Sequence, residues 1–188
     1  MVIIQKNVPL IIIDVQKAFL DPSWGNRNNP HAEENIKQLL NQWRNTNRPV
    51  IFIQHVSWSN KNSLFYIEKE SSDFKDGIKP NEQEMVFQKT VNSSFIGTNL
   101  ERHLTELDPQ NIVIVGLTTN HCVETTTRMA GNLGFSPILV SDATATFDRK
   151  DKDGKLYLAE DIHNMTMVNL HEEFAQIQTT EEILDGLS

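Results

Sequence analysis

Three residues that lie far apart in the sequence carry side chains that could together form and break an acyl bond. Cys122 is the only cysteine of the chain, Asp14 ends one apolar run and Lys89 follows another. A thiol can act as a nucleophile, a carboxylate as its base and an ammonium as a charge partner. Each residue also has an ordinary structural interpretation: a packing cysteine, a turn or capping aspartate and a solvated lysine.

Cys122 lies in segment 111–130, where an apolar run gives way to a helical pattern. A thiol at a helix N-terminus faces unpaired backbone N–H groups and the positive end of the helix dipole, and both favour the thiolate. No second cysteine can form an internal disulfide with it. The position therefore favours a reactive thiol.

Short apolar runs alternate with amphipathic segments along the chain. Most runs are continuously apolar, which is typical of strands covered on both faces. The expected strands are 8–13, 50–53, 85–87, 112–115, 137–140 and 174–177. The expected helices are 32–44, 95–107, 122–133 and 156–170. This alternation predicts one α/β domain, residues 1–188, with a parallel sheet between helical layers.

The carboxyl ends of these strands are where a ligand is expected, because crossovers diverge to opposite faces at a switch point there. Asp14 follows the first strand, Lys89 the third and Cys122 the fourth, so the three side chains are expected in one crevice. The irregular stretch 55–84 is too long for an idle connection, and we expect it to be a lid or a pocket wall.

Composition narrows the class of protein. The net charge of −8 and the pI near 5.2 argue against nucleic acid and anionic membranes as partners, and no run of Lys and Arg offsets this balance. No stretch approaches the roughly 18 to 20 apolar residues of a membrane-spanning helix. No G-x-G-x-x-G follows the first strand, which argues against a dinucleotide-binding enzyme. We expect a cytoplasmic protein without a cofactor.

Four segments resemble the isochorismatase-like cysteine hydrolases, a family that includes nicotinamidases and N-carbamoylsarcosine amidohydrolase. They are D-V-Q-K-A-F from Asp14, F-Q-K-T-V-N-S-S-F-I-G-T-N-L from Phe87, G-L-T-T-N-H-C-V-E-T-T from Gly116 and S-D-A-T-A-T-F from Ser141. The resemblance spans almost the full chain, and the third segment is its most specific part. It implies a three-layer α/β/α sandwich with a six-stranded, mostly parallel sheet, and a homo-oligomer.

By this resemblance, Asp14, Lys89 and Cys122 correspond to the family's Asp-Lys-Cys triad. It also implies a cis peptide bond before Thr118, and an oxyanion hole made by the backbone N–H groups of Thr118 and Cys122. The expected reaction is hydrolysis of a small amide or ureide through a thioester, with a partly desolvated Asp14 as base and then acid. A redox or sensor role of the lone thiol is the main alternative.

The expected site departs from that of nicotinamidases, which bind a divalent ion through an Asp-x-His segment after the second strand. Gln54 and His55 stand here, without the aspartate and without a second histidine. One histidine does not make a metal site, so we expect no metal, and a nicotinamidase-type amidase is only an alternative. Segment 149–160 matches part of an EF-hand loop but begins with an arginine, and we expect a charged hairpin or loop there.

Side chains near the expected crevice indicate the kind of substrate. Phe19 and Trp58 supply aromatic surface that suits a small planar amide or carbamoyl compound. Gln54 could donate a hydrogen bond to a substrate carbonyl. His121 is expected to be a pocket wall or a surface residue, because adjacent residues at a helix start project about 100° apart and it cannot readily take a proton from Cys122. True isochorismatases lack the nucleophilic cysteine, which argues against isochorismate as substrate.

Overall fold

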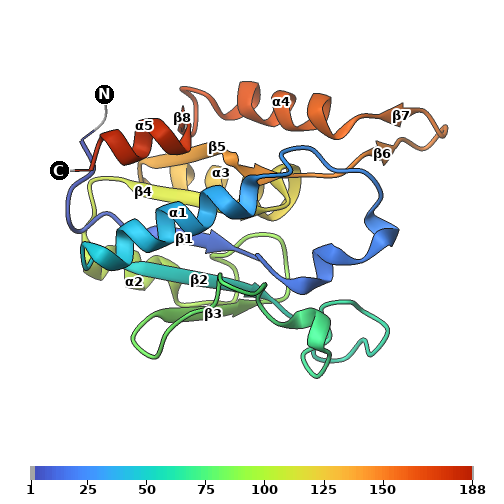
Figure 1. The fold of residues 1–188 in the computed structure, drawn as a ribbon, viewed down its shortest axis with the longest axis horizontal. Coiled ribbons are helices and arrows are strands. Elements are labelled where there is room, and N and C mark those ends of the chain that lie inside the picture. The colour runs from blue at the N-terminus through green and yellow to red at the C-terminus, as the bar shows by residue number, and fades with distance from the viewer. Residues whose placement is uncertain (1–2, 188) are drawn as a thin grey trace.

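The central sheet contains six parallel strands, as the sequence predicts. In the computed structural model, which describes residues 3–187, the strand order is β3-β2-β1-β4-β5-β8 (Figure 1). Every pairing between neighbours is parallel, so the strands all end at the same edge of the sheet. The strands are β1 (Leu10–Ile13), β2 (Val50–His55), β3 (Met85–Lys89), β4 (Ile112–Leu117), β5 (Pro137–Ala145) and β8 (Gln176–Gln178).

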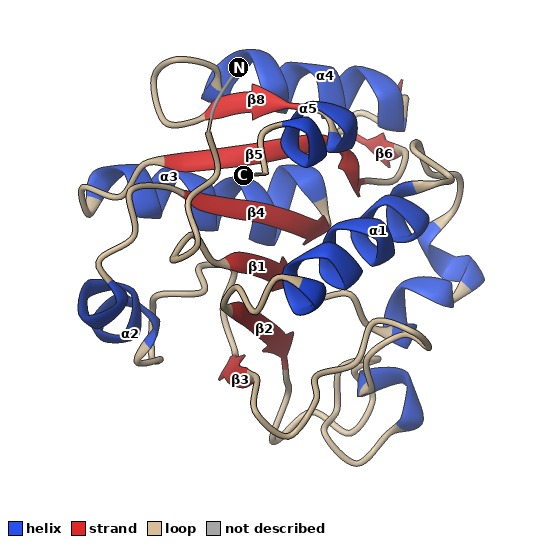
Figure 2. Cartoon of the chain, turned by 60° about the vertical axis from the view of Figure 1, so that its left-hand side comes forward, coloured by secondary structure: helices blue, strands red, loops and turns tan. Residues whose placement is uncertain are grey.

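Helices cover both faces of this sheet and complete a three-layer α/β/α sandwich. They are α1 (Ala32–Asn45), α2 (Leu100–Leu107), α3 (Glu124–Asn132), α4 (Ala159–Leu170) and α5 (Thr180–Asp185). α1 and α5 pack on one face, while α2, α3 and α4 pack on the other. Figure 2 shows α1 and α5 in front of the sheet and α3 behind it. Because both faces are covered, the central strands β1 and β4 carry no polar side chain.

α1 illustrates how the sequence pattern produces the packing. Ile36, Leu39, Leu40 and Trp43 recur at helical spacing, and all four are fully buried against one face of the sheet. The indole N–H of Trp43 donates to the carbonyl of Val8, 2.9 Å away, so the largest side chain of the helix is buried with its polar atom satisfied.

The chain changes direction across the sheet between β1 and β4. β1 is followed by β2 on one side, and β4 is followed by β5 on the other. At this point Gly116 has a φ of 130°, and a Cβ added there would lie 2.1 Å from the carbonyl oxygen of Ile13. Only glycine allows this close approach, which brings the segment after β4 beside the end of β1.

Two predicted helices begin later than the sequence pattern indicates. α2 begins at Leu100 and not at residue 95, because Gly97 has a φ of 75° and Thr98 donates its hydroxyl to the carbonyl of Ser94 in a turn. α4 begins at Ala159, because the residues before it form a strand of a hairpin.

That hairpin pairs β6 (Arg149–Lys150) with β7 (Leu156–Tyr157) and confirms the charged hairpin expected there. α5 was not predicted. It is six residues long, too short for a clear helical periodicity, and begins with a capping box of Thr179 and Glu182. Among residues 3–187, no helix has the length and apolar character needed to cross a membrane.

Candidate active site

Asp14 follows β1 in a backbone conformation that turns the chain away from the sheet. Its φ is 52°, in the left-handed region that aspartate adopts more readily than most residues. The N–H of Gln16 donates to the Asp14 carbonyl over 2.8 Å, which closes the turn. Asp14 is thus a turn residue, as one interpretation of the sequence had it, but its carboxylate is also fully buried at the carboxyl end of the sheet.

Lys89 ends β3, and its ammonium reaches the same place. Lys89 Nζ lies 2.6 Å from Asp14 Oδ2, and the two side chains are 0% and 1% exposed. A lysine at a strand end is usually solvated, and this one is among the largest fully buried side chains of residues 3–187. Breaking such a buried pair leaves an uncompensated charge, so the two residues depend on each other.

Cys122 lies in a π-helical turn, Thr119–Val123, that leads directly into α3. One ligand atom from each of Asp14, His55 and Cys122 lies within 4.8 Å of the others, so the structure brings the thiol to the ion pair. Burial, followed by the charge of Asp14, raises the pKa of Cys122 to about 12, and the charge of Lys89 offsets only part of this rise. Desolvation therefore favours the neutral thiol, whereas the place of Cys122 at a helix start favours the thiolate.

One oxygen of Asp14 has no partner. Oδ2 accepts a hydrogen bond from Lys89, whereas Oδ1 has none. Among residues 3–187, no other buried side-chain oxygen or nitrogen lacks a hydrogen bond. Leaving a buried acceptor unpaired is costly, and such atoms in folded proteins generally have a functional or structural explanation. Oδ1 is free to accept a proton from a neighbouring thiol, substrate or water.

A cavity of about 210 Å³ opens over these groups. Three aromatic rings form one wall: Phe19 lies 5.0 Å from Trp24 and 5.4 Å from Phe65, centroid to centroid. The lining residues are Asp14, Phe19, Trp24, His55, Phe65, Asn92, Thr118, His121 and Cys122. Phe65 belongs to the long stretch after β2, which therefore supplies part of the pocket wall, as expected.

The segment that carries Cys122 has the backbone feature implied by the family resemblance. The peptide bond between Leu117 and Thr118 is cis. Thr118 lines the cavity beside Cys122, and its hydroxyl lies 3.1 Å from Nδ1 of His121. His121 is thus a pocket wall residue bonded within its own loop.

Two residues expected to bind substrate lie elsewhere. The Gln54 side chain is buried between strands: Nε2 donates to the Ser72 carbonyl over 2.9 Å, and Oε1 accepts from Gln88 over 3.0 Å. With its polar atoms occupied in this way, Gln54 anchors the loop after β2 and does not line the cavity. Trp58 is 59% exposed and also lies outside the lining. Neither residue lines this cavity, so a role of Gln54 or Trp58 in substrate binding stays a prediction, and strand-end position alone did not reveal where the side chains point.

Two lining residues were not anticipated. His55 was considered only as part of an incomplete metal motif, yet its Nδ1 lies 3.1 Å from Lys89 Nζ. Asn92 lies three residues after Lys89, in the segment that the family resemblance covers. The signal that could have identified His55 was its place at the end of a strand adjacent to that of Asp14.

Asp14, His55 and Cys122 could in principle supply an oxygen, a nitrogen and a sulfur ligand to a metal ion. The ammonium of Lys89 already lies 2.6 Å from the first and 3.1 Å from the second. A divalent ion bound there would sit against this buried cation, so the geometry favours the internal ammonium over a metal.

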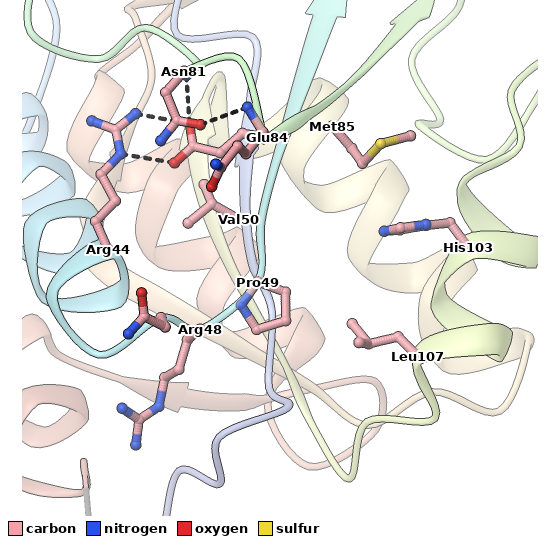
Figure 3. A pocket seen from close by; sticks show the side chains of 11 residues that line it. Arg44, Arg48, Pro49, Val50, Asn81, Glu84, Met85, His103 and Leu107 are labelled. Carbon is pink, nitrogen blue, oxygen red and sulfur yellow. Dashed lines mark hydrogen bonds and ion pairs between the residues drawn. The ribbon is translucent and has the colours of Figure 1, made fainter.

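A second cavity, of about 360 Å³, lies at the amino ends of β2 and β3 (Figure 3). Its prominent charged pair is Arg44 and Glu84, joined by two hydrogen bonds of 2.8 Å. Arg48 donates to the backbone carbonyl of Ile4. Arg44 and Glu84 are thus bonded to each other, and no cysteine lines this cavity.

Comparison with known proteins agrees with this geometry. Residues 9–182 match the family model described as Isochorismatase domain. The isochorismatase family protein YrdC of Bacillus subtilis is 52% identical over 94% of both chains. A crystal structure of a hydrolase of the isochorismatase family from Chromobacterium violaceum superposes with a TM-score of 0.95 and 38% identity, over 99% of this chain and 96% of that one. Nicotinamidase 3 of Arabidopsis thaliana is 26% identical, over 97% of this chain and 89% of its own.

Proposed function

Because this chain belongs to the isochorismatase family of hydrolases, we propose that it is a cysteine-dependent hydrolase of a small amide or ureide that acts through a thioester. The observation that carries the proposal is the unpartnered Oδ1 of Asp14, buried beside a thiol and held in place by Lys89. A carboxylate in this position can take the proton of a thiol whose raised pKa otherwise keeps it neutral.

The first half-reaction forms the thioester. Cys122 Sγ attacks the carbonyl carbon of the substrate while its proton moves to Asp14 Oδ1. The oxyanion is stabilised by the backbone N–H groups of Thr118 and Cys122. The protonated Asp14 then gives this proton to the leaving nitrogen, the C–N bond breaks, and an amine or ammonia departs. Lys89 keeps the carboxylate positioned and balances its charge throughout.

The second half-reaction restores the enzyme. Water attacks the thioester carbonyl, and Asp14 takes one proton from the water. The C–S bond breaks, the acid product leaves, and the sulfur regains the proton held by Asp14. One water is consumed for each C–N bond cleaved, and no other reagent is required.

The cavity supports a small substrate with a planar acyl group. Its volume of about 210 Å³ and its wall of Phe19, Trp24 and Phe65 suit a compact amide or carbamoyl compound. Nicotinamide itself is less favoured. Nicotinamidase 3 is a relative, but Gln54 and His55 replace the Asp-x-His segment here, and Gln54 is buried between strands.

A sensor role of the thiol is less well supported. Rapid oxidation requires an accessible thiolate, whereas Cys122 is 8% exposed and burial raises its pKa to about 12.

We also propose a cytoplasmic location, because a free catalytic thiol persists in a reducing compartment. Self-association is proposed from the family resemblance, and the apolar side chains of Met165 and Val168, exposed on α4, offer a surface for it.

The decisive experiment combines turnover with detection of the intermediate. Wild-type protein and C122A are incubated with a panel of small amides, ureides and carbamoyl amino acids, and ammonia release is measured. We expect ammonia from at least one compound with wild type and none with C122A, together with an acyl adduct on Cys122 in intact-protein mass spectrometry. Undiminished hydrolysis by folded C122A would refute the proposal, and rapid sulfenate formation with peroxide but no ammonia release would favour the sensor.

A further inference from the structure

His55 stands between the buried ion pair and the cavity. It is the last residue of β2, it lines the cavity, and its ring lies 5.1 Å from that of Phe65. Its Nδ1 lies 3.1 Å from Lys89 Nζ. The mechanism above gives His55 no part, although it contacts one of the three groups on which the mechanism depends.

The contact with Lys89 determines where the proton of His55 lies. An ammonium only donates hydrogen bonds, so Nδ1 must offer its lone pair to Lys89. Burial, followed by the charge of Lys89, lowers the pKa of His55, which keeps the ring neutral. A neutral imidazole whose Nδ1 accepts carries its proton on Nε2. His55 lines the cavity, and the ring nitrogen that it has left for a substrate is therefore a donor.

The backbone of His55 is fixed by a buried glutamine. Gln16 Oε1 accepts from the His55 N–H over 2.9 Å, and Gln16 Nε2 donates to the His55 carbonyl over 3.0 Å. The same Nε2 donates to the Ser72 carbonyl over 2.7 Å. Gln16 is two residues from Asp14, so this clamp ties the imidazole to the turn that carries the carboxylate. Such support is expected where a side chain must hold another group in place.

We propose that His55 is a positioning residue that holds the Lys89 ammonium through Nδ1, and that its Nε2–H group donates to an acceptor atom in the acyl portion of the substrate. The ammonium then has two fixed acceptors, Asp14 Oδ2 and His55 Nδ1, and cannot swing away from the thiol. The substrate class narrows to amides or ureides whose acyl portion bears a second oxygen or nitrogen acceptor. The donor role of Nε2 rests on the proposed hydrolase function, whereas the positioning role of Nδ1 does not.

The positioning half is tested with two variants of matched shape. In H55N the side-chain oxygen takes the place of Nδ1 as acceptor, while H55L has the same branched outline without an acceptor. The measured quantity is the rate of Cys122 alkylation by iodoacetamide at fixed pH, which requires no substrate. We expect H55N to stay within about threefold of wild type and H55L to be slower by about tenfold or more, since a hydrogen bond to a charged group is lost.

The donor half is tested with H55Q, whose longer side chain places an amide near the position of Nε2. With a substrate from the amide panel, we expect H55Q to keep KM within about threefold of wild type and to lower kcat about as much as H55L. H55N should raise KM about tenfold and keep kcat. H171N, at the exposed end of α4, is the control and should match wild type in every measurement.

Equal alkylation rates for H55N and H55L, both folded by circular dichroism, would overturn the positioning role. If H55L does not fold, H55F fills the imidazole volume without a lone pair and serves the same comparison. Equal KM values for H55N and H55Q would overturn the donor role. If no compound of the panel is hydrolysed by wild type, the hydrolase function fails while the alkylation rates still decide the positioning role.

Discussion

The two ends of the sheet hold cavities that differ in size and in the state of their charged groups. The cavity at the amino ends of β2 and β3 is larger, about 360 Å³ against about 210 Å³ at the carboxyl end. In the larger one, Arg44 and Glu84 form two hydrogen bonds with each other (Figure 3). In the smaller one, Asp14 keeps an oxygen without a partner beside Cys122.

This difference teaches that volume does not identify the reactive site. A charged pair that is already hydrogen-bonded to itself has less bonding capacity left for a substrate than a buried carboxylate oxygen without a partner. Burial also differs: the Arg44 and Glu84 side chains are 30% and 8% exposed, while those of Asp14 and Lys89 are at most 1% exposed. The comparison can be tested by making the same changes at both ends.

The largest effect is expected from removing the carboxylate. D14N deletes the base and should lower kcat about a thousandfold, in the usual range for general acid–base catalysis. E84Q makes the same chemical change at the amino end and should leave kcat at the wild-type value. Both rates are measured on the amide that wild type hydrolyses best. A D14N variant that is folded and fully active would remove the functional distinction between the two cavities.

The next effect concerns stability. K89M leaves the Asp14 carboxylate buried without its partner and should lower the free energy of unfolding by about 3 to 5 kcal/mol. R44M breaks a partly exposed pair and should cost about 1 kcal/mol or less. Urea denaturation gives both values. A similar loss of unfolding free energy in the two variants would show that burial does not make the two ion pairs different. The double variant D14N/K89M should recover part of the stability lost in K89M without recovering activity.

α1 carries an ion pair at each of its ends, and the one at its start should give a pH dependence. Burial acts to raise the pKa of Glu33, but Arg27 and Lys75 outweigh it and hold the pKa at about 2, below the ordinary 4.5. Because the folded-state pKa is depressed, the stabilisation is full above pH 4.5 and disappears as the pH falls toward 2.

E33Q should therefore be less stable than wild type at pH 7, by about 1 to 3 kcal/mol after allowance for solvent screening. The difference should shrink steadily between pH 4.5 and pH 2 in urea denaturation. E84Q removes a carboxylate from the ion pair at the other end of α1 and serves as the control for the loss of one negative charge. A difference between E33Q and wild type that does not change over this pH range would contradict the assignment.

The smallest effects compare two aromatic residues of the stretch between β2 and β3. F65A removes a ring from the cavity wall and should raise KM about tenfold, which corresponds to about 1.4 kcal/mol of lost apolar contact. W58A removes a ring that is 59% exposed and outside the lining, so KM should not change. A rise of KM in W58A equal to that in F65A would mean that the loop closes over the substrate and brings Trp58 to it.

The sequence predicted the architecture and the meeting of three distant residues for one reason. In a parallel sheet covered by helices, all strands end at the same edge, so side chains that follow strands must gather there. Asp14, Lys89 and Cys122 follow strands that prove to be β1, β3 and β4, and the structure brings them together. Periodicity likewise gave α1 almost to the residue, since its buried positions recur at helical spacing.

Position along a strand did not determine side-chain contacts. Gln54 and His55 are neighbours at the end of β2, and the sequence assigned a substrate role to the first and none to the second. In the structure, Gln54 bonds Ser72 and Gln88, while His55 reaches Lys89 and the cavity. Successive strand residues point to opposite faces, so a shift of one residue exchanges the two roles.

The sequence by itself determined which reactive side chains this protein carries and at which edge of the sheet they lie, because the hydrophobic periodicity of strands and helices is a local property. Only the tertiary structure decided their states: burial favours the neutral thiol, one oxygen of Asp14 lacks a partner and Lys89 has two acceptors. These states arise from desolvation and from hydrogen bonds between elements remote in the chain. Neither the desolvation nor these hydrogen bonds exist until the three layers have packed.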